Sequence, residues 1–105
     1  MRKYLLHILI ISFVFLLVPT ACINRKVEEH FNLGNAYYES GKHEEAMESY
    51  KQALRIDPKN AKAHAGLGAI YFLRKDRDSA LEQYKILKNL DPKLANQLFN
   101  LIYKK

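Results

Sequence analysis

The chain carries the stretch HFNLGNAY at His30–Tyr37 and repeats it as HAGLGAIY at His64–Tyr71, 34 residues later. The two blocks that contain these stretches, residues 27–60 and 61–94, align without a gap. The repeated positions are Leu33, Gly34, Tyr37, Ala46, Tyr50 and Pro58 in the first block, and Leu67, Gly68, Tyr71, Ala80, Tyr84 and Pro92 in the second. A fixed period of this size indicates a solenoid, whose units bury their apolar faces against one another.

The spacing inside each block predicts two helices joined by a short turn. In the first helix Leu33, Gly34 and Tyr37 recur three and four residues apart, which places them on one face. Gly34 has no side chain, so we expect a neighbouring helix to approach closely there. Gly41 suits the left-handed conformation that commonly ends a helix. The second block has Lys75 at the equivalent position, so we expect its turn to close differently.

Each block ends in the same three residues, Asp57–Lys59 and Asp91–Lys93. We expect both aspartates to cap the following helix, with the proline at its first position, where no amide donor is needed. After the second block, Leu94, Leu98 and Leu101 lie on one stripe of a further helix. The sequence therefore predicts an all-α fold with helices near residues 26–40, 43–56, 60–74, 77–90 and 92–103.

This pattern resembles the tetratricopeptide repeat (TPR), a 34-residue helix–turn–helix unit. The resemblance implies a right-handed α-solenoid of two repeats, residues 27–60 and 61–94, with residues 95–105 completing a capping helix. His30 and His64 stand where the family often has tryptophan. Leu87 stands where the first block has Ala53, so we expect the second helix of the second block to pack less closely. The family implies a scaffold that binds other proteins and not an enzyme.

The first 21 residues have the composition of a signal peptide. A basic start is followed by an apolar run over 5–18, shorter than the roughly 20 residues that span a bilayer. The following VPTAC resembles a bacterial lipobox, which implies cleavage before Cys22, lipidation of its thiol and a short tether over 22–26. Pro19 departs from the usual aliphatic residue, so an ordinary signal or an uncleaved anchor stays open. The expected location is the bacterial cell envelope, membrane-anchored on the exported side.

In this family the first helix of each repeat lines a groove that holds the partner. The resemblance implies that the groove residues are Phe31, Asn35, Tyr38, Glu39, Ala65, Ala69, Phe72, Leu73 and Phe99. Some members hold an acidic C-terminus with basic and amide groups on this face, and only Asn35 fits that pattern here. We therefore expect a peptide or helix of another protein to bind an apolar groove. A second copy could instead close the groove in a homo-oligomer, or the chain's own terminus could cover it.

Other classes of function find little support in the sequence. A single cysteine excludes an internal disulfide, and no zinc-ligand spacing, phosphate-binding loop or convergent set of polar residues is present. Equivalent positions of neighbouring repeats lie about 10 Å apart, while zinc ligands lie about 2 Å from the metal, so we expect His30 and His64 to pack and not to bind metal. The net charge of +6 is spread along the chain, which does not favour nucleic-acid binding. No cofactor is expected.

Overall fold

The computed structural model describes residues 2–104, and side chains from residue 21 to residue 104. It contains α1 (Arg2–Glu39), α2 (His43–Ile56), α3 (Ala61–Leu73), α4 (Arg77–Leu90) and α5 (Pro92–Tyr103). Residues 2–104 contain no strand, so the prediction of an all-α fold is confirmed. The predicted signal peptide lies, but for its last residue, outside the described side chains.

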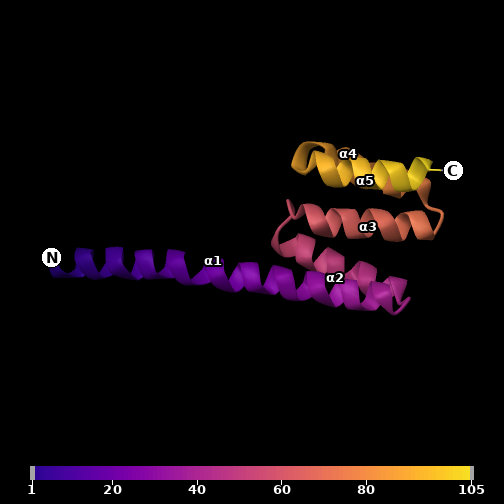
Figure 1. Ribbon diagram of the computed structural model, residues 1–105. Helices are drawn as coiled ribbons and strands as arrows, with labels where there is room; N and C mark the ends of the chain where they lie inside the picture. Colours follow the sequence, from indigo (N-terminus) through magenta and orange to yellow (C-terminus); the bar gives the residue numbers. More distant parts are fainter. Residues whose placement is uncertain (1, 105) are drawn as a thin grey trace.

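The helices stack in chain order as two layers (Figure 1). α1, α3 and α5 form one layer, in which α3 contacts both of the others. α2 packs against α1 and α3, and α4 packs against α3 and α5. Each helix thus contacts only near neighbours in the chain, which is consistent with the predicted α-solenoid.

The first helix differs most from its predicted bounds. α1 runs without interruption from Arg2 to Glu39, so the residues expected to form a tether, 22–26, are helical. Figure 1 shows the N-terminal part of α1 extending beyond the other helices. Val27 is the first buried residue among the described side chains, and the packed part of the chain begins there. Among the described residues, no helix has both the length and the apolar character required to cross a membrane.

The two turns between paired helices have the same geometry, contrary to the prediction for Lys75. Gly41 has φ 76° and Lys75 has φ 63°, both in the left-handed region. In each turn the next residue donates its amide to a carbonyl five residues earlier, Lys42 to Tyr37 and Asp76 to Tyr71, both at 2.9 Å. The same backbone hydrogen bonds therefore fix both turns, and Lys75 bears the steric cost that Gly41 avoids.

Replacing Lys75 with glycine is expected to stabilise the chain by about 0.5–1 kcal/mol. Glycine removes the contact between Cβ and backbone that disfavours positive φ, and this gain outweighs the greater entropy of glycine in the unfolded chain. Urea unfolding of the wild type, Lys75→Gly and Lys75→Ala measures the effect, since alanine removes the charge but keeps the strain. A Lys75→Gly variant no more stable than Lys75→Ala would contradict the explanation.

The two Asp-Pro sequences behave differently at the starts of α3 and α5. Asp91 caps α5 as predicted, because its Oδ1 accepts hydrogen bonds from the amides of Lys93 and Leu94, with Pro92 in the first turn. The prediction for Asp57 is wrong. Asn60 is the N-cap of α3, its Oδ1 accepting from the amide of Ala63 at 2.9 Å, and Pro58 lies in the preceding turn. Asn60 directly precedes α3, so its side chain takes the capping role that was predicted for the more distant Asp57.

Tyr50 of α2 joins the first three helices. Its side chain is 2% exposed and lies between Gly34 of α1 and Gly66 of α3. A Cβ atom built at Gly34 would lie 2.6 Å from the Tyr50 ring, and one at Gly66 would lie 2.7 Å from it. Gly68 makes an equally close approach to Leu98 of α5. The close contacts predicted at Gly34 and Gly68 are thus confirmed, and Gly66 is a third that the sequence comparison did not identify.

The repeated leucines do not share one environment. Leu67 is 3% exposed within the core formed with α2, whereas Leu33 is 46% exposed. The inward position expected for Leu33 is wrong, because in the described part of the chain no helix packs over that face of α1. Leu87 is completely buried and forms a second core with Ala95 and Leu98. The larger side chain at this position is therefore accommodated without solvent exposure.

The remaining repeat positions follow a simple division. The repeated alanines are completely buried, while three of the four repeated tyrosines are partly exposed. The buried pair is Ala46 and Ala80, and the half-buried residues are Tyr37, Tyr71 and Tyr84. Small side chains on α2 and α4 thus permit close packing within each pair of helices.

Candidate protein-binding groove

A shallow groove runs along the layer formed by α1, α3 and α5. Its first part has a volume of about 340 Å³ and its second part about 160 Å³, and both parts share Ala65, Ala69 and Leu94. We call it the central groove. Its lining residues are Phe31, Asn35, Tyr38, Tyr50, Lys62, Ala65, Gly66, Ala69 and Leu94, continued by Gln97, Leu98 and Leu101.

The central groove has small residues in the middle and large ones at its sides. α3 contributes Ala65, Gly66 and Ala69, whose small side chains leave space in the middle of the groove. Phe31 of α1 stands on one side and Leu94 of α5 on the other. This arrangement follows from the stacking, since α3 lies between the two outer helices of the layer. The result is an apolar surface with room for the side chains of a ligand.

Hydrogen bonding and ring contacts hold the α1 side of the central groove in place. The Tyr50 hydroxyl donates to Oδ1 of Asn35 at 2.6 Å. The Phe31 and Tyr50 rings lie 5.8 Å apart between centroids, and the Tyr38 ring meets His43 edge-on at 6.0 Å. Burial, with smaller effects of Tyr38 and Glu39, raises the pKa of Tyr50 to about 12, so its hydroxyl remains a hydrogen-bond donor even at pH values where an ordinary tyrosine ionises.

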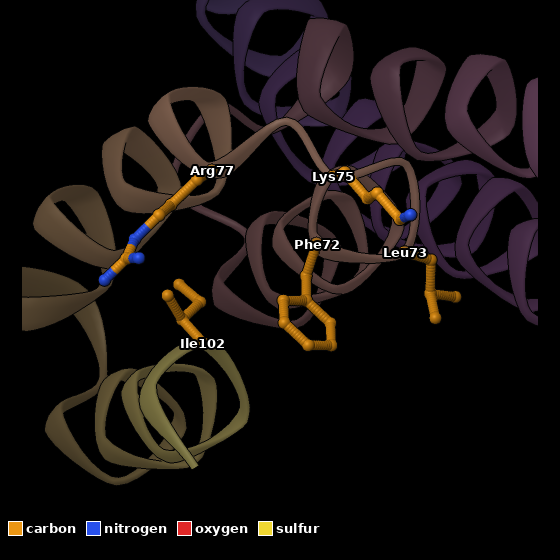
Figure 2. A pocket seen from close by; sticks show the side chains of 5 residues that line it. All are labelled: Phe72, Leu73, Lys75, Arg77 and Ile102. Carbon is orange, nitrogen blue, oxygen red and sulfur yellow. The ribbon is translucent and has the colours of Figure 1, made fainter. Parts of the chain in front are cut away.

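Five of the nine residues predicted for the groove line it together, namely Phe31, Asn35, Tyr38, Ala65 and Ala69. Phe72 and Leu73 line a separate hollow at the end of α3 (Figure 2). Phe99 points to another side of α5, where its ring packs against those of Tyr84 and Tyr103 at 5.4 and 4.5 Å. Glu39 is exposed at the last residue of α1.

The separation of Phe99 from the groove has a helical cause. Leu94, Leu98 and Leu101 recur four and three residues apart and face the groove, so Phe99 turns toward α4. The sequence alone contained this signal, because these three leucines form the apolar stripe of the closing helix. The other lining residues that the family resemblance did not indicate are Tyr50, Lys62, Gly66 and Gln97.

His64 has a structural position between α3 and α4. Its ring is buried, and Nε2 lies 2.8 Å from the carbonyl oxygen of Pro58, to which it donates because a carbonyl can only accept. Nδ1 lies 2.7 Å from the side-chain amide of Gln83. Both ring nitrogens are therefore engaged by protein groups, in agreement with the predicted packing role. His30, at the equivalent position of the first repeat, is partly exposed.

Two further side chains, those of Cys22 and His43, lie outside the groove lining. Cys22 is a free, exposed thiol on α1. His43 lies at the start of α2, half-buried against Tyr38, so it is less solvated than its position at a helix start indicates.

Comparison with known families supports the predicted repeat. A family model described as TPR repeat matches residues 34–74, from Gly34 in α1 to Arg74 after α3. No curated protein matches the chain. The matched residues include the turn at Gly41, the whole of α2 and the whole of α3, which together provide Tyr50 and the middle of the central groove. Sequence match and helix arrangement thus both support a TPR-type repeat in this part of the chain.

Proposed function

We propose that this chain is a TPR-type scaffold that binds an apolar peptide or amphipathic helix of another protein in the central groove. The observation that carries the proposal is the lining itself. Lys62 is the only charged residue among its members, and Ala65, Gly66 and Ala69 leave space between larger side chains. An amphipathic helix inserts side chains at spacings of three and four into grooves of this kind.

The aromatic residues of the groove are expected to provide most of the affinity. Phe31 and Tyr38 are partly exposed, and both belong to the side that Tyr50 and Asn35 hold in place. Rigid aromatic side chains at the centre of an interface commonly dominate its binding energy. Because the lining carries one cation, binding is expected to persist at high salt, where exposed charge pairs are screened.

A photo-crosslinking amino acid at Ala69 tests the groove in cells. We expect crosslinks to a partner protein from Ala69 and none from Glu45, an exposed position on α2 that serves as the matched control. Phe31→Ala is expected to reduce the Ala69 crosslinks at least several-fold. Identification of the crosslinked peptide by mass spectrometry would distinguish a partner from a second copy of this chain. Equal crosslinking from Ala69 and Glu45 would contradict the proposal.

We further propose that the scaffold is tethered to the bacterial envelope through Cys22, on the exported side of the membrane. The support is the signal-like sequence before an exposed thiol. Residues 22–26 are helical, and with a rise of about 1.5 Å per residue Cys22 lies about 8 Å along the axis from Val27. A lipid on Cys22 would therefore hold the packed helices close to the membrane surface on a stiff connection.

Lipidation of Cys22 predicts a defined change in mass. The membrane-bound protein is expected to lack residues 1–21 and to carry acyl groups on Cys22, and Cys22→Ala is expected to abolish both changes. Intact-mass spectrometry of the membrane fraction measures them, with Cys22→Ser as a second variant that keeps a small polar side chain. A membrane-bound protein with an intact N-terminus and an unmodified Cys22 would instead show that the chain is retained by an uncleaved anchor.

A further inference from the structure

A row of side chains crosses the seam between α4 and α5, away from the central groove. The Arg77 guanidinium lies 4.6 Å from the centroid of the Tyr103 ring, and the Tyr103 and Phe99 centroids are 4.5 Å apart. The Phe99 centroid lies 5.4 Å from that of Tyr84, and the Lys88 ammonium lies 5.6 Å from the Tyr84 centroid. We call these five side chains the α4–α5 strip. It shares no residue with the central groove, so it is a separate candidate surface.

Helical spacing aligns the α4–α5 strip along both helices. Arg77, Tyr84 and Lys88 are seven and four residues apart, so they lie on one face of α4. Phe99 and Tyr103 are four residues apart on α5. In Figure 2 the Arg77 side chain extends from α4 toward α5. The strip therefore has its rings in the middle and a cation at each end.

The α4–α5 strip is held in place by its own contacts but is open to solvent. Phe99 is 40% exposed and Tyr103 is 43% exposed. Arg77 and Lys88 are exposed as well. A hollow of about 400 Å³ lies beside the rings and is lined by Phe99, Asn100, Tyr103 and Lys104. Rings in fixed positions next to open space are suited to receive the apolar side chains of a partner.

The cations of the α4–α5 strip are not compensated by ion pairs. Neither Arg77 nor Lys88 takes part in the ion pairs found among residues 21–104, whose cations are Arg25, Arg55, Arg74 and Lys85. Asp76 and Asp91, at the two ends of α4, use their side chains to cap α4 and α5. Asp78 is next to Arg77 in sequence, but it lies about 100° away around the helix. The strip therefore presents positive charge at both ends.

We propose that the α4–α5 strip binds an amphipathic helix of a partner protein, with an acidic residue at each end of a short apolar face. Arg77 and Lys88 are 11 residues apart on α4, which is about 16 Å along the axis at a rise of about 1.5 Å per residue. A partner helix that lies along the seam has the same rise, so carboxylates 11 residues apart match the two cations. Apolar residues four and seven positions after the first carboxylate lie on the same face and meet the rings.

Other classes of ligand fit the α4–α5 strip less well. A row of nucleic-acid bases stacks on open ring faces, whereas Arg77 and Lys88 lie over the rings at the two ends of the strip. In Figure 1 α4 and α5 lie on the far side of the stack from α1 and run along it. A membrane that held the N-terminal end of α1 would therefore lie across the helix axes and not along the seam. The proposal does not depend on the ligand of the central groove.

The probe is a fluorescein-labelled twelve-residue peptide of alanine and glutamine, with glutamate at both ends and Phe and Leu at its fifth and eighth positions. A hydrocarbon staple on its other face holds it helical. We expect saturable binding to the full chain in lipid nanodiscs, measured by fluorescence anisotropy. Peptides with glutamine in place of both glutamates, or alanine in place of Phe and Leu, are expected to bind at least tenfold more weakly. Equal binding of the glutamine peptide would overturn the match of charges.

A pair of charge-matched variants separates the α4–α5 strip from the overall positive charge. Arg77→Gln combined with Lys88→Gln is expected to weaken binding of the peptide at least tenfold. Lys26→Gln combined with Lys59→Gln removes the same charge from exposed positions outside the strip and is expected to leave binding within twofold. Equal weakening by both pairs would overturn the proposal.

Two residues of α5 provide a matched test of the rings. Phe99 of the strip and Leu101 of the central groove are each 40% exposed. Phe99→Ala is expected to weaken binding of the peptide at least several-fold, and Leu101→Ala is expected to leave it within twofold. Melting temperatures of both variants show whether the fold is kept. Equal effects of the two changes would overturn the contact with the rings.

A photo-crosslinking amino acid at Asn100 locates the peptide without altering the strip. Asn100 lines the hollow beside the rings, so we expect it to crosslink to the peptide, and a crosslinker at the exposed Asn32 of α1 to form no product. Equal crosslinking from both positions would overturn the location. Crosslinks from Asn100 to lipid in nanodiscs of phosphatidylglycerol, with none to the peptide, would overturn the partner helix and assign the strip to a membrane surface.

Discussion

Replacing Gly34 or Gly66 with alanine is expected to destabilise the chain by about 1–3 kcal/mol. Alanine is the better helix former by about 1 kcal/mol, so propensity alone predicts stabilisation. The added methyl group would, however, lie 2.6–2.7 Å from the buried Tyr50 ring, closer than carbon atoms can approach. The ring cannot move away, because glycines of α1 and α3 contact it from two sides. Overpacking of this kind typically costs 1–3 kcal/mol and separates the helices.

Urea unfolding of Gly34→Ala, Gly66→Ala and Asn32→Ala measures the effect. Asn32 is exposed on α1, so its replacement reports helix propensity alone and is expected to be neutral or slightly stabilising. Gly34→Ala combined with Tyr50→Leu is expected to lose less stability than the sum of the single changes, since each relieves the contact made by the other. A Gly34→Ala variant as stable as Asn32→Ala would contradict the role assigned to the glycine.

The sequence predicted the elements of this fold well because they depend on local periodicity. The bounds of α2 to α5, the close contacts at Gly34 and Gly68 and the cap at Asp91 all follow from residue types at fixed spacing. Gly66 was not identified because it has no partner in the first repeat, where Asn32 stands at the equivalent position. Comparing the two repeats with each other finds only the features that both share, whereas the contact of Gly66 with Tyr50 uses a glycine that the first repeat lacks.

The predictions that failed depend on what surrounds a residue. Leu33 and Leu67 are equivalent in sequence, but only Leu67 has a helix of the preceding repeat beside it. Lys75 adopts the conformation of Gly41 because the hydrogen bonds of the turn outweigh the preference of one residue. The candidate groove was half predicted for the same reason. Two equivalent pairs face it, Phe31 with Ala65 and Asn35 with Ala69. Phe72 lines the separate hollow although its equivalent Tyr38 lines the groove, and α5, which belongs to no complete repeat, turns Phe99 toward α4.

Alkaline pH is expected to destabilise the chain through Tyr50, by about 2–3 kcal/mol between pH 10 and pH 12. The pKa of tyrosine is about 10 in an unfolded chain, and burial raises that of Tyr50 to about 12 in the fold. Below pH 10 both states keep the proton and the full stability is present. Between pH 10 and pH 12 the unfolded chain loses the proton that the folded chain retains, so stability falls by about 1.4 kcal/mol per pH unit.

The difference in unfolding free energy between the wild type and Tyr50→Phe isolates this effect, because the other titrating groups are common to both proteins. At pH 8 the wild type is expected to be more stable by about 1 kcal/mol, owing to the hydrogen bond from Tyr50 to Asn35. As the pH rises above 10, the phenylalanine variant lacks the group that ionises on unfolding, so the order of stability is expected to reverse. A constant difference from pH 8 to pH 11.5 would show that the Tyr50 hydroxyl ionises as readily in the fold as in the unfolded chain, and that its burial does not keep it protonated.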